Sequence, residues 1–175
     1  MDSPTTYDYI NLGIALAGLL LALGALGWQA MTWLLSGPRV TVDMQIGGVG
    51  PGGLLLGPPG SDPIKWMGQF PPGAFTDPVV VAQVSNKGRM PVSIASVSAV
   101  FDLGVELKDL NNTFPSNPEL PHRLEPYSDM TYLLPGVQVS AAASATASAL
   151  GGRHDVGLLV QLGGGKQVRT KRQPL

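Results

Sequence analysis

Histidine is the side chain best suited to acid–base or metal chemistry near neutral pH, and this 175-residue chain contains two, His122 and His154. Neither has a second histidine at the HxH or HxxxH spacing that metal sites use. His122 stands between Pro121 and Arg123, and His154 follows a Gly-Gly-Arg stretch, so both positions are typical of solvated surface. We therefore predict that neither histidine acts as a general base or as a metal ligand.

The other groups that enzymes use are absent from the sequence or scattered along it. The chain has no cysteine, which excludes a thiolate nucleophile, a thiolate metal site and a disulfide framework. The Gly-rich stretch GVGPGG (48–53) is interrupted by Pro51 and lacks the lysine and hydroxyl of a phosphate-binding loop. The carboxylates occupy separate, loop-like positions, among them Glu106, Asp109, Glu119 and Glu125. We therefore expect no enzyme, no catalytic residues, no cofactor and no small-molecule substrate.

One charge cluster stands near the C-terminus, with four basic residues in seven and no acid: Lys166, Arg169, Lys171 and Arg172. Two interpretations are open. Each positive charge could add about 1 kcal/mol of attraction to an anionic lipid surface. Alternatively, the charges protect an exposed edge strand against pairing with other sheets. A nucleic-acid partner is excluded, because the net charge is -1 and stacking aromatics are lacking.

An apolar segment near the N-terminus, residues 10–35, predicts a transmembrane helix after a short polar N-terminus, residues 1–9. No charged residue occurs between Asp8 and Arg39, and about 20 apolar residues cross a hydrocarbon core of about 30 Å. Aromatic rings favour the headgroup region, and we expect the interfacial anchor residues to be Tyr9, Ile10, Trp28 and Trp33. Ser-Gly-Pro (36–38) then ends the helix.

A cleaved secretory signal is the alternative interpretation of this segment. Its N-terminal flank carries Asp2 and Asp8 with no basic residue, and its apolar run exceeds the usual signal core, so we favour a retained anchor. All 11 basic residues follow the helix, beginning with Arg39. The positive-inside rule then places the N-terminus outside and the C-terminal domain in the cytoplasm, with the chain in the cell (inner) membrane as a single-pass protein.

Small residues recur near one face of the expected helix: Gly13, Ala17, Gly24 and Gly27. Such positions let a second helix approach closely, so this face could bind another membrane protein or a second copy of the chain. Glycine and alanine are also common in ordinary anchors, and this simpler interpretation stays open.

Residues 38–175 form the candidate domain next to the membrane, and alternating apolar residues predict several short strands in it. They are expected at 39–46, 79–84, 91–101 with a bend near Ala95–Ser96, 127–134, 156–162 and 166–171. The second and third strands are expected as a hairpin or as adjacent sandwich strands. The last two strands flank Gly163–Gly165, which predicts a hairpin.

Between the strands, residues 47–78 are dense in Gly and Pro and predict a long loop without regular structure. Its apolar residues either cover one end of the core or contact lipid or a partner, with Trp66 and Phe70 as the contact residues. Residues 109–121 predict a surface excursion. Residues 137–150 predict a short helix, with a flexible Ala/Ser linker as the alternative. The expected fold class is mainly β: a transmembrane α-helix followed by an antiparallel immunoglobulin-like β-sandwich with one short helix.

The chain resembles a loosely defined group of small actinobacterial and actinobacteriophage single-pass membrane proteins of unknown function. The resemblance is carried in the same order by 27–30 with Trp33 and 36–40, then by 84–92, 120–126 and 160–171 (GWQA, W, SGPRV, VSNKGRMPV, LPHRLEP and VQLGGGKQVRTK). It implies one anchor and a compact C-terminal β-sandwich, and it carries over no catalytic residues. The segments 47–78 and 141–149 depart from the pattern.

Two functional hypotheses follow. The first is a single-pass, membrane-anchored, non-enzymatic binding or scaffolding module, whose partners are the lipid bilayer and another membrane protein or itself. The alternative is a phage-encoded membrane effector that excludes other phages or assists lysis. Expression that collapses the membrane potential would favour the effector.

Overall fold

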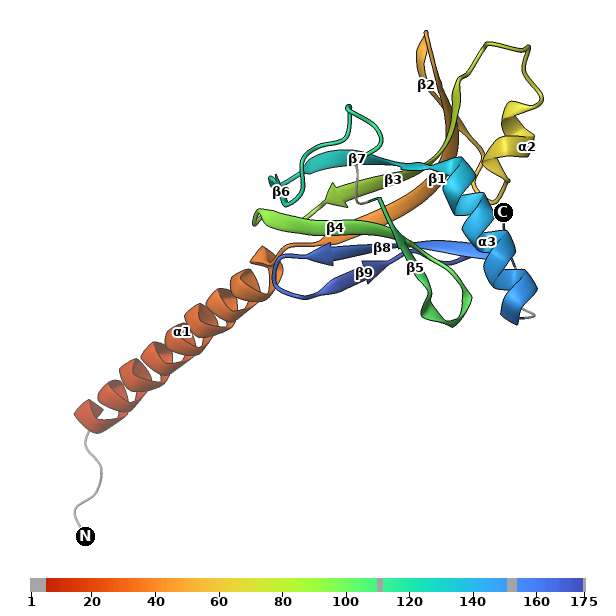
Figure 1. The fold of residues 1–175 in the computed structure, drawn as a ribbon. Helices are drawn as coiled ribbons and strands as arrows, with labels where there is room; N and C mark the ends of the chain where they lie inside the picture. Colours follow the sequence, from red (N-terminus) through yellow and green to blue (C-terminus); the bar gives the residue numbers. More distant parts are fainter. Residues whose placement is uncertain (1–5, 110–111, 151–153, 175) are drawn as a thin grey trace. The chain divides into compact units, whose positions relative to one another are not determined.

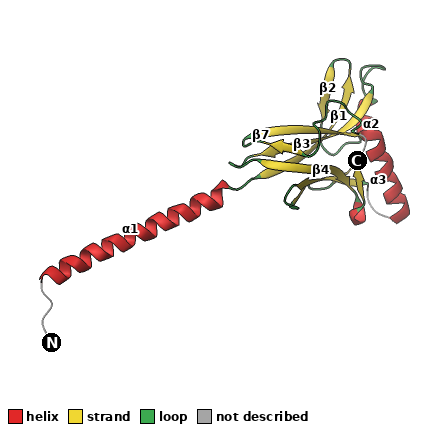
Figure 2. Ribbon diagram, turned by 60° about the vertical axis from the view of Figure 1, so that its left-hand side comes forward, coloured by secondary structure: helices red, strands yellow, loops and turns green. Residues whose placement is uncertain are grey.

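The computed structural model describes residues 6–109, 112–150 and 154–174. The chain divides into two compact units, Met1–Gly37 and Pro38–Leu175. The first contains the helix α1 (Thr6–Ser36), and the second contains two β-sheets and the remaining helices (Figures 1 and 2).

Helix α1 runs for 31 residues, slightly beyond the predicted 10–35 at its N-terminal end. Its interior is rich in Leu and Ala, which are strong helix formers, and contains no proline. The helix ends at Ser36 because Pro38 cannot continue it and disfavours helical geometry at the residue before it. The predicted helix is confirmed.

The second unit is built from two sheets in which every pairing between described strands is antiparallel. The first sheet has the order β2 (Gly53–Gly57), β1 (Val40–Gly50), β3 (Asp77–Asn86) and β7 (Ser128–Pro135). The second has the order β10 (Gln173–Pro174), β8 (Asp155–Leu162), β4 (Val92–Val100) and β5 (Glu106–Lys108), with β6 (His122–Leu124) on β4 and β9 (Gln167–Arg169) on β8. Three short elements complete it: α2 (Pro63–Met67), a 3-10 turn η1 (Asp102–Gly104) and α3 (Gly136–Leu150).

The strand order is that of an immunoglobulin-like sandwich. In chain order, β1, β3 and β7 take the places of strands A, B and E in one sheet, and β4, β8 and β9 take those of C, F and G in the other. Helix α3 occupies the connection between the E-like and F-like strands. The predicted fold class is confirmed, and so is the short helix, since 136–150 is helical rather than a linker.

The core lies between the two sheets and is filled by alternate residues of each strand, as the period-2 pattern predicts. Register places Met44 opposite Ala82, and Ala82 opposite Tyr132, so large and small side chains share one layer. Buried residues of six strands form this cluster, and its largest wholly buried members are Phe101, Ile94, Leu134 and Leu158. Val139 and Ala143 of α3, four residues apart on one helix face, extend the core.

Three local expectations need correction or refinement. Strands β3 and β4 lie in different sheets and do not pair, so the expected hairpin is wrong. The bend near Ala95–Ser96 is confirmed as a register shift between Ile94 and Ser96. The C-terminal hairpin is confirmed, but β9 ends at Arg169, because the Thr170 hydroxyl accepts the Leu158 N–H (2.8 Å) and breaks the strand pattern.

The predicted unstructured loop at 47–78 is wrong. β1 continues to Gly50, turns into β2, and α2 and the start of β3 occupy much of the rest. The glycines that predicted a loop instead clear space for neighbours. A Cβ at Gly47 would lie 2.6 Å from the Leu55 carbonyl oxygen, and one at Gly48 would lie 2.9 Å from the Phe75 ring.

Candidate functional site

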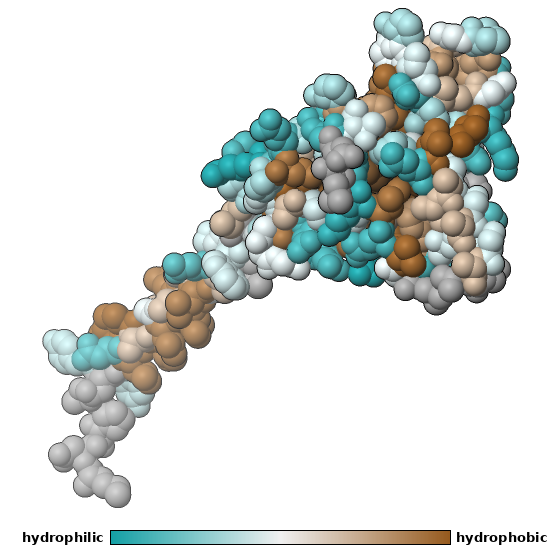
Figure 3. All heavy atoms as spheres, in the orientation of Figure 1, coloured by the Kyte–Doolittle hydropathy of each residue, from teal (hydrophilic) through white to brown (hydrophobic). Residues whose placement is uncertain are grey.

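The first candidate site is the apolar surface of α1. A span of 25 residues, Tyr9–Trp33, has a mean hydropathy of 2.1, and none of it is buried in the structure. At about 1.5 Å per residue it is about 37 Å long, enough to cross a hydrocarbon core of about 30 Å. Figure 3 shows apolar side chains along the helix. The helix is long and apolar enough to span a membrane, and an N-terminal signal sequence has the same properties.

The residues expected as interfacial anchors lie in or near the two ends of this span, and their role as anchors stays a prediction. Ile10 lies next to Tyr9 at its start, and Trp33 closes it, with Trp28 one to two turns before that end. All four side chains are exposed. The Thr32 hydroxyl donates to the carbonyl oxygens of Trp28 and Gln29 (both 2.9 Å), so its polar group is satisfied within the helix.

The small residues do share one face of α1. At about 100° per residue, Gly13, Ala17, Gly24 and Gly27 lie within an arc of about 80°. A Cβ added at any of the three glycines would meet nothing within 4 Å, so the face is open. Its use by a second helix stays a prediction.

Trp66, predicted as a contact residue for lipid or a partner, is instead buried, with 9% of its surface exposed. Asp62 caps α2 by accepting the Ile64 N–H (2.8 Å), which positions the indole against Gly57 of β2. Its ring centroid lies 5.0 Å from that of Phe70 and 6.0 Å from that of Phe75. Phe70 is half-buried in this cluster. The alternative expectation, that this segment covers part of the core, is therefore the better one.

The basic cluster lies along the outer side of β8. β9 pairs only its three residues with β8, and Lys166, Arg169 and Lys171 are exposed. Arg172 differs, because its Nη1 lies 2.7 Å from Asp102 Oδ1 in an ion pair. The cluster therefore presents three charges at an edge strand rather than four, and Trp66 and Phe70 pack elsewhere. Of the three, Arg169 lies in β9 itself, and Lys166 and Lys171 flank the strand.

A hollow of about 490 Å³ lies beside this basic segment. One wall is the first half of β1, from Val42 to Gln45, which β2 does not reach because it pairs only from Ile46 onward. Arg169, Lys171 and Gln173 contribute to the opposite wall. Asp43 supplies the acidic group of this hollow.

The predicted surface excursion at 109–121 folds back onto the first sheet. Phe114 is buried on the outer face with Val79, Val81 and Leu133. Asn117 is also buried, and its side chain donates to the Leu133 carbonyl oxygen (2.9 Å) and accepts the Leu133 N–H (2.7 Å). The Asn117 amide thus satisfies the backbone N–H and C=O of Leu133, the groups that a neighbouring strand would otherwise bind at this edge of β7.

Tyr132 is the one described side chain whose pKa is clearly displaced. Burial raises the pKa of its hydroxyl above 10.0, and the nearby Asp109 carboxylate raises it further, against a smaller lowering from a hydrogen bond with Asn117. Asp109 itself accepts the Thr113 N–H (2.8 Å) and hydroxyl (3.0 Å). The hydroxyl of Tyr132 therefore stays protonated near neutral pH and is not a base.

The two histidines are exposed to different degrees. His122 is half-exposed on β6, and His154 is exposed just before β8. Among the residues that the structure describes, no group of three or more His, Asp or Glu side chains could hold a metal ion. Glu125 forms an ion pair with Arg123 (2.9 Å) on the surface.

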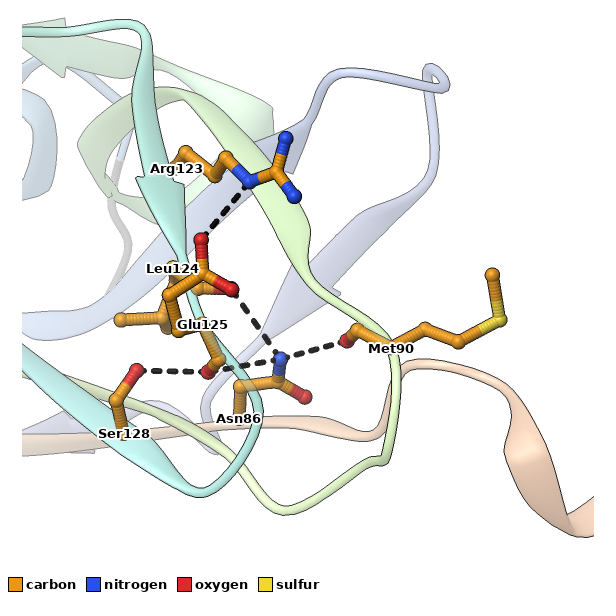
Figure 4. A network of polar contacts seen from close by, with 6 residues as sticks. All are labelled: Asn86, Met90, Arg123, Leu124, Glu125 and Ser128. Carbon is orange, nitrogen blue, oxygen red and sulfur yellow. Dashed lines mark hydrogen bonds and ion pairs between the residues drawn. The ribbon is translucent and has the colours of Figure 1, made fainter.

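Asn86 was not singled out from the sequence as a functional side chain, yet it makes four side-chain hydrogen bonds in the described part of the sandwich (Figure 4). It is buried at the end of β3, and its Nδ2 donates to the carbonyl oxygens of Met90 (2.9 Å), Glu125 (3.2 Å) and Leu124 (3.4 Å). Its Oδ1 accepts the Gly88 N–H (3.0 Å). The sequence does indicate a turn at Asn86, where an Asn side chain often hydrogen-bonds nearby backbone. It does not indicate the two partners at 124–125, because they are remote in sequence.

No family model, curated protein or solved structure matches this chain. The resemblance to actinobacterial and actinobacteriophage membrane proteins therefore stays a prediction.

Proposed function

We propose that the chain is a single-pass membrane protein whose immunoglobulin-like sandwich is a non-enzymatic binding module held at the bilayer. The observation that carries the proposal is the apolar span Tyr9–Trp33, none of which is buried. Burying one large apolar side chain is worth about 1.5–3 kcal/mol, so such a helix requires an apolar environment. A hydrocarbon core matches its length and its aromatic ends.

The sandwich supports the second half of the proposal. Immunoglobulin-like folds commonly serve recognition, so the fold supports a binding role. We further propose that the N-terminus lies outside and the sandwich in the cytoplasm of a cell (inner) membrane, because all 11 basic residues follow α1. We assign the exposed Lys166, Arg169 and Lys171 to edge protection rather than to lipid binding.

Fractionation of cells that produce the full-length chain tests the anchor. We expect the chain in the membrane fraction, resistant to alkaline carbonate, with its N-terminal residues intact by mass spectrometry. A matched variant, Leu20→Arg with Leu21→Arg, should leave the membrane, because each central arginine costs about 2.5–3.5 kcal/mol of insertion. A carbonate-soluble wild type, or one trimmed behind α1, would contradict the proposal.

Cysteine labelling tests the orientation, since the natural chain has no cysteine. An impermeant maleimide should label Ser3→Cys in intact cells, and should label Gly164→Cys, in the exposed turn before β9, only after lysis. Labelling of Gly164→Cys in intact cells would contradict the proposed orientation but not the proposed membrane anchor.

A binding module should accumulate without harm to the cell. We expect a potential-sensitive dye to report an unchanged membrane potential after induction. Depolarisation that the Leu20→Arg/Leu21→Arg variant does not cause would favour the effector hypothesis instead.

A further inference from the structure

Strand β2 forms an outer edge of the first sheet that lacks the usual protection against strand pairing. It reads Gly-Leu-Leu-Leu-Gly, and Leu54, Leu55 and Leu56 are 40%, 44% and 48% exposed. Each of the other described outer strands contains a charged residue or a proline, or has its backbone hydrogen-bonded by a side chain. The charged residues are Glu106 and Lys108 in β5, Arg123 in β6 and Arg169 in β9. The proline is Pro174 in β10, and the side chain is that of Asn117, which binds the backbone of β7.

The register shows which backbone groups this edge presents. The Val49 carbonyl accepts the Thr76 N–H (2.8 Å), so Val49 directs its backbone groups toward the β3 side. Leu54 lies opposite Val49 in the antiparallel β1–β2 pair, so the two form a non-hydrogen-bonded pair. The N–H and C=O of Leu54 therefore point away from β1, and by alternation those of Leu56 do too.

We propose that β2 pairs in antiparallel fashion with β2 of a second copy of this chain, joining the two first sheets into one. In this register, Leu55 of one copy lies opposite Leu55 of the other, and Leu54 of each lies opposite Leu56 of the other. Gly53 and Gly57 then face each other at both ends. This pairing goes beyond the proposed binding module, and its geometry comes from the sandwich alone.

The register follows from hydrogen bonding. With Leu55 at the two-fold axis, both outward-facing residues of each copy form hydrogen-bonded pairs, and all their N–H and C=O groups are satisfied. If the register shifts by two residues, only one hydrogen-bonded pair forms, and the N–H and C=O groups of the other outward-facing residue in each copy have no partner in the second strand. The turn at Pro51–Gly52 and the prolines at 58 and 59 close the strand at both ends, so the pairing cannot extend further.

The sequence of β2 favours a second copy over an unrelated protein. Its five residues read the same in both directions, so one strand meets its own pattern when the partner runs antiparallel. The contact is isologous and closes as a dimer. No charge lies in the strand to select an oppositely charged partner, and the paired leucines cover one another on both faces.

Disulfide trapping in the full-length chain tests the pairing. A residue pair of the non-hydrogen-bonded type has Cα atoms about 4.5 Å apart, within the range of about 4.4–6.8 Å for a disulfide. Under mild oxidation, Leu55→Cys should give a covalent dimer. Ile64→Cys and Val137→Cys, of similar or greater exposure on other elements, should stay monomeric. Leu54→Cys should cross-link when mixed with Leu56→Cys, but not alone, because diagonal positions lie too far apart.

A proline placed on the outward-facing position separates edge pairing from other contacts. Leu56→Pro removes an N–H that β1 does not use, so the chain should keep its fold while Leu55→Cys loses its cross-link. Leu56→Val in the same background is the matched control and should keep the cross-link. Cooperative urea unfolding of the Leu56→Pro variant, followed by fluorescence, verifies that the fold is retained.

Each outcome decides the proposal. Cross-linking of Leu55→Cys no stronger than at Ile64→Cys overturns it, as does cross-linking that persists in a folded Leu56→Pro variant. A cross-linked product with a mass other than twice that of the chain would replace the second copy by a different protein. Failure of membrane fractionation with a positive Leu55→Cys cross-link would overturn the anchor and leave the pairing intact.

Discussion

Replacing Asn86 by aspartate tests whether one buried amide holds together the end of the sandwich shown in Figure 4. In the native chain, Nδ2 faces three carbonyl oxygens at 2.9–3.4 Å and Oδ1 accepts one backbone N–H at 3.0 Å. Asn86→Asp keeps the size of the side chain and the acceptor for Gly88. It replaces the only donor by an anionic oxygen.

The expected cost follows from these contacts. An amide has two N–H hydrogens, so two hydrogen bonds are lost at about 1 kcal/mol each. An ionised carboxylate buried against carbonyl oxygens adds at least about another 1 kcal/mol of desolvation and repulsion. We therefore expect the free energy of unfolding to fall by about 3 kcal/mol at pH 8. Because burial against carbonyl oxygens, with the Gly88 N–H as its one donor in this network, raises the pKa of the introduced carboxyl, the charged form is disfavoured in the folded state, and the deficit should shrink as the pH falls toward 5.

Urea unfolding of the full-length chain in nonionic detergent measures this difference. Trp28→Phe and Trp33→Phe in all samples leave Trp66, which is packed in the sandwich, as the tryptophan reporter. Gln69→Glu, at an exposed position, controls for the added charge and should change stability by less than about 0.5 kcal/mol. A loss in Asn86→Asp below about 1 kcal/mol, or one independent of pH, would refute the assignment of Nδ2 as the key donor.

The same assay addresses three further changes. Gly57→Ala should cost about 1–3 kcal/mol, because its Cβ would lie 2.7 Å from the Trp66 ring, whereas Gly52→Ala, with nothing within 4 Å, should be tolerated. Asn117→Ala should cost about 2 kcal/mol, because it leaves one N–H and one C=O of β7 without partners; an unchanged midpoint would show that water replaces the amide. Since the pKa of Tyr132 is raised above 10.0, native stability should be complete below pH 10 and fall as the pH rises through the folded-state pKa, and Tyr132→Phe should flatten this decline. An identical alkaline profile for both would contradict it.

The fold could be predicted wherever a side-chain pattern repeats over a whole element. Alternation in 39–46 and 127–134 identified β1 and β7 and the faces they bury, because a strand with one face in the core needs an apolar residue at every second position. The pattern could not assign β3 and β4 to different sheets. That assignment depends on how the chain crosses at 86–90, where Asn86 binds backbone that is about 40 residues further along.

Glycine explains the largest error. Glycine is depleted in strands, so Gly47, Gly48 and Gly50 indicated a loop. In the structure the missing side chains are what the strand requires, since Phe75 packs over Gly48, and the Leu55 carbonyl approaches Gly47. A glycine also explains the error made at Trp66. Trp66 looked like a contact residue from its sequence neighbours, but Gly57 leaves room for its indole against β2.

The edge strands of the sandwich could be recognised only in part from the sequence. Whether an edge strand is open to pairing depends on the segments that lie beside it in the fold. The charges of 166–172 are visible in the sequence, yet the ion pair of Arg172 with Asp102 spans 70 positions. Asn117 blocks β7 from a segment that reads as a polar excursion. β2 was not predicted as a strand at all, so its open edge emerged only from the register.

If α1 holds the chain in a membrane, it raises the effective concentration at which two β2 edges meet. A pair of five-residue strands buries far less than the roughly 1,200–2,000 Å² of a stable soluble interface, so β2 pairing should be weak between freely diffusing chains. Confinement of two copies to one bilayer raises their effective concentration, as a linker does for two tethered modules. We therefore expect the Leu55→Cys cross-link to be strong in native membranes and to fade as detergent-solubilised chain is diluted. A cross-link that is undiminished on dilution would mean that β2 pairing is tight by itself, and that anchoring contributes nothing to it.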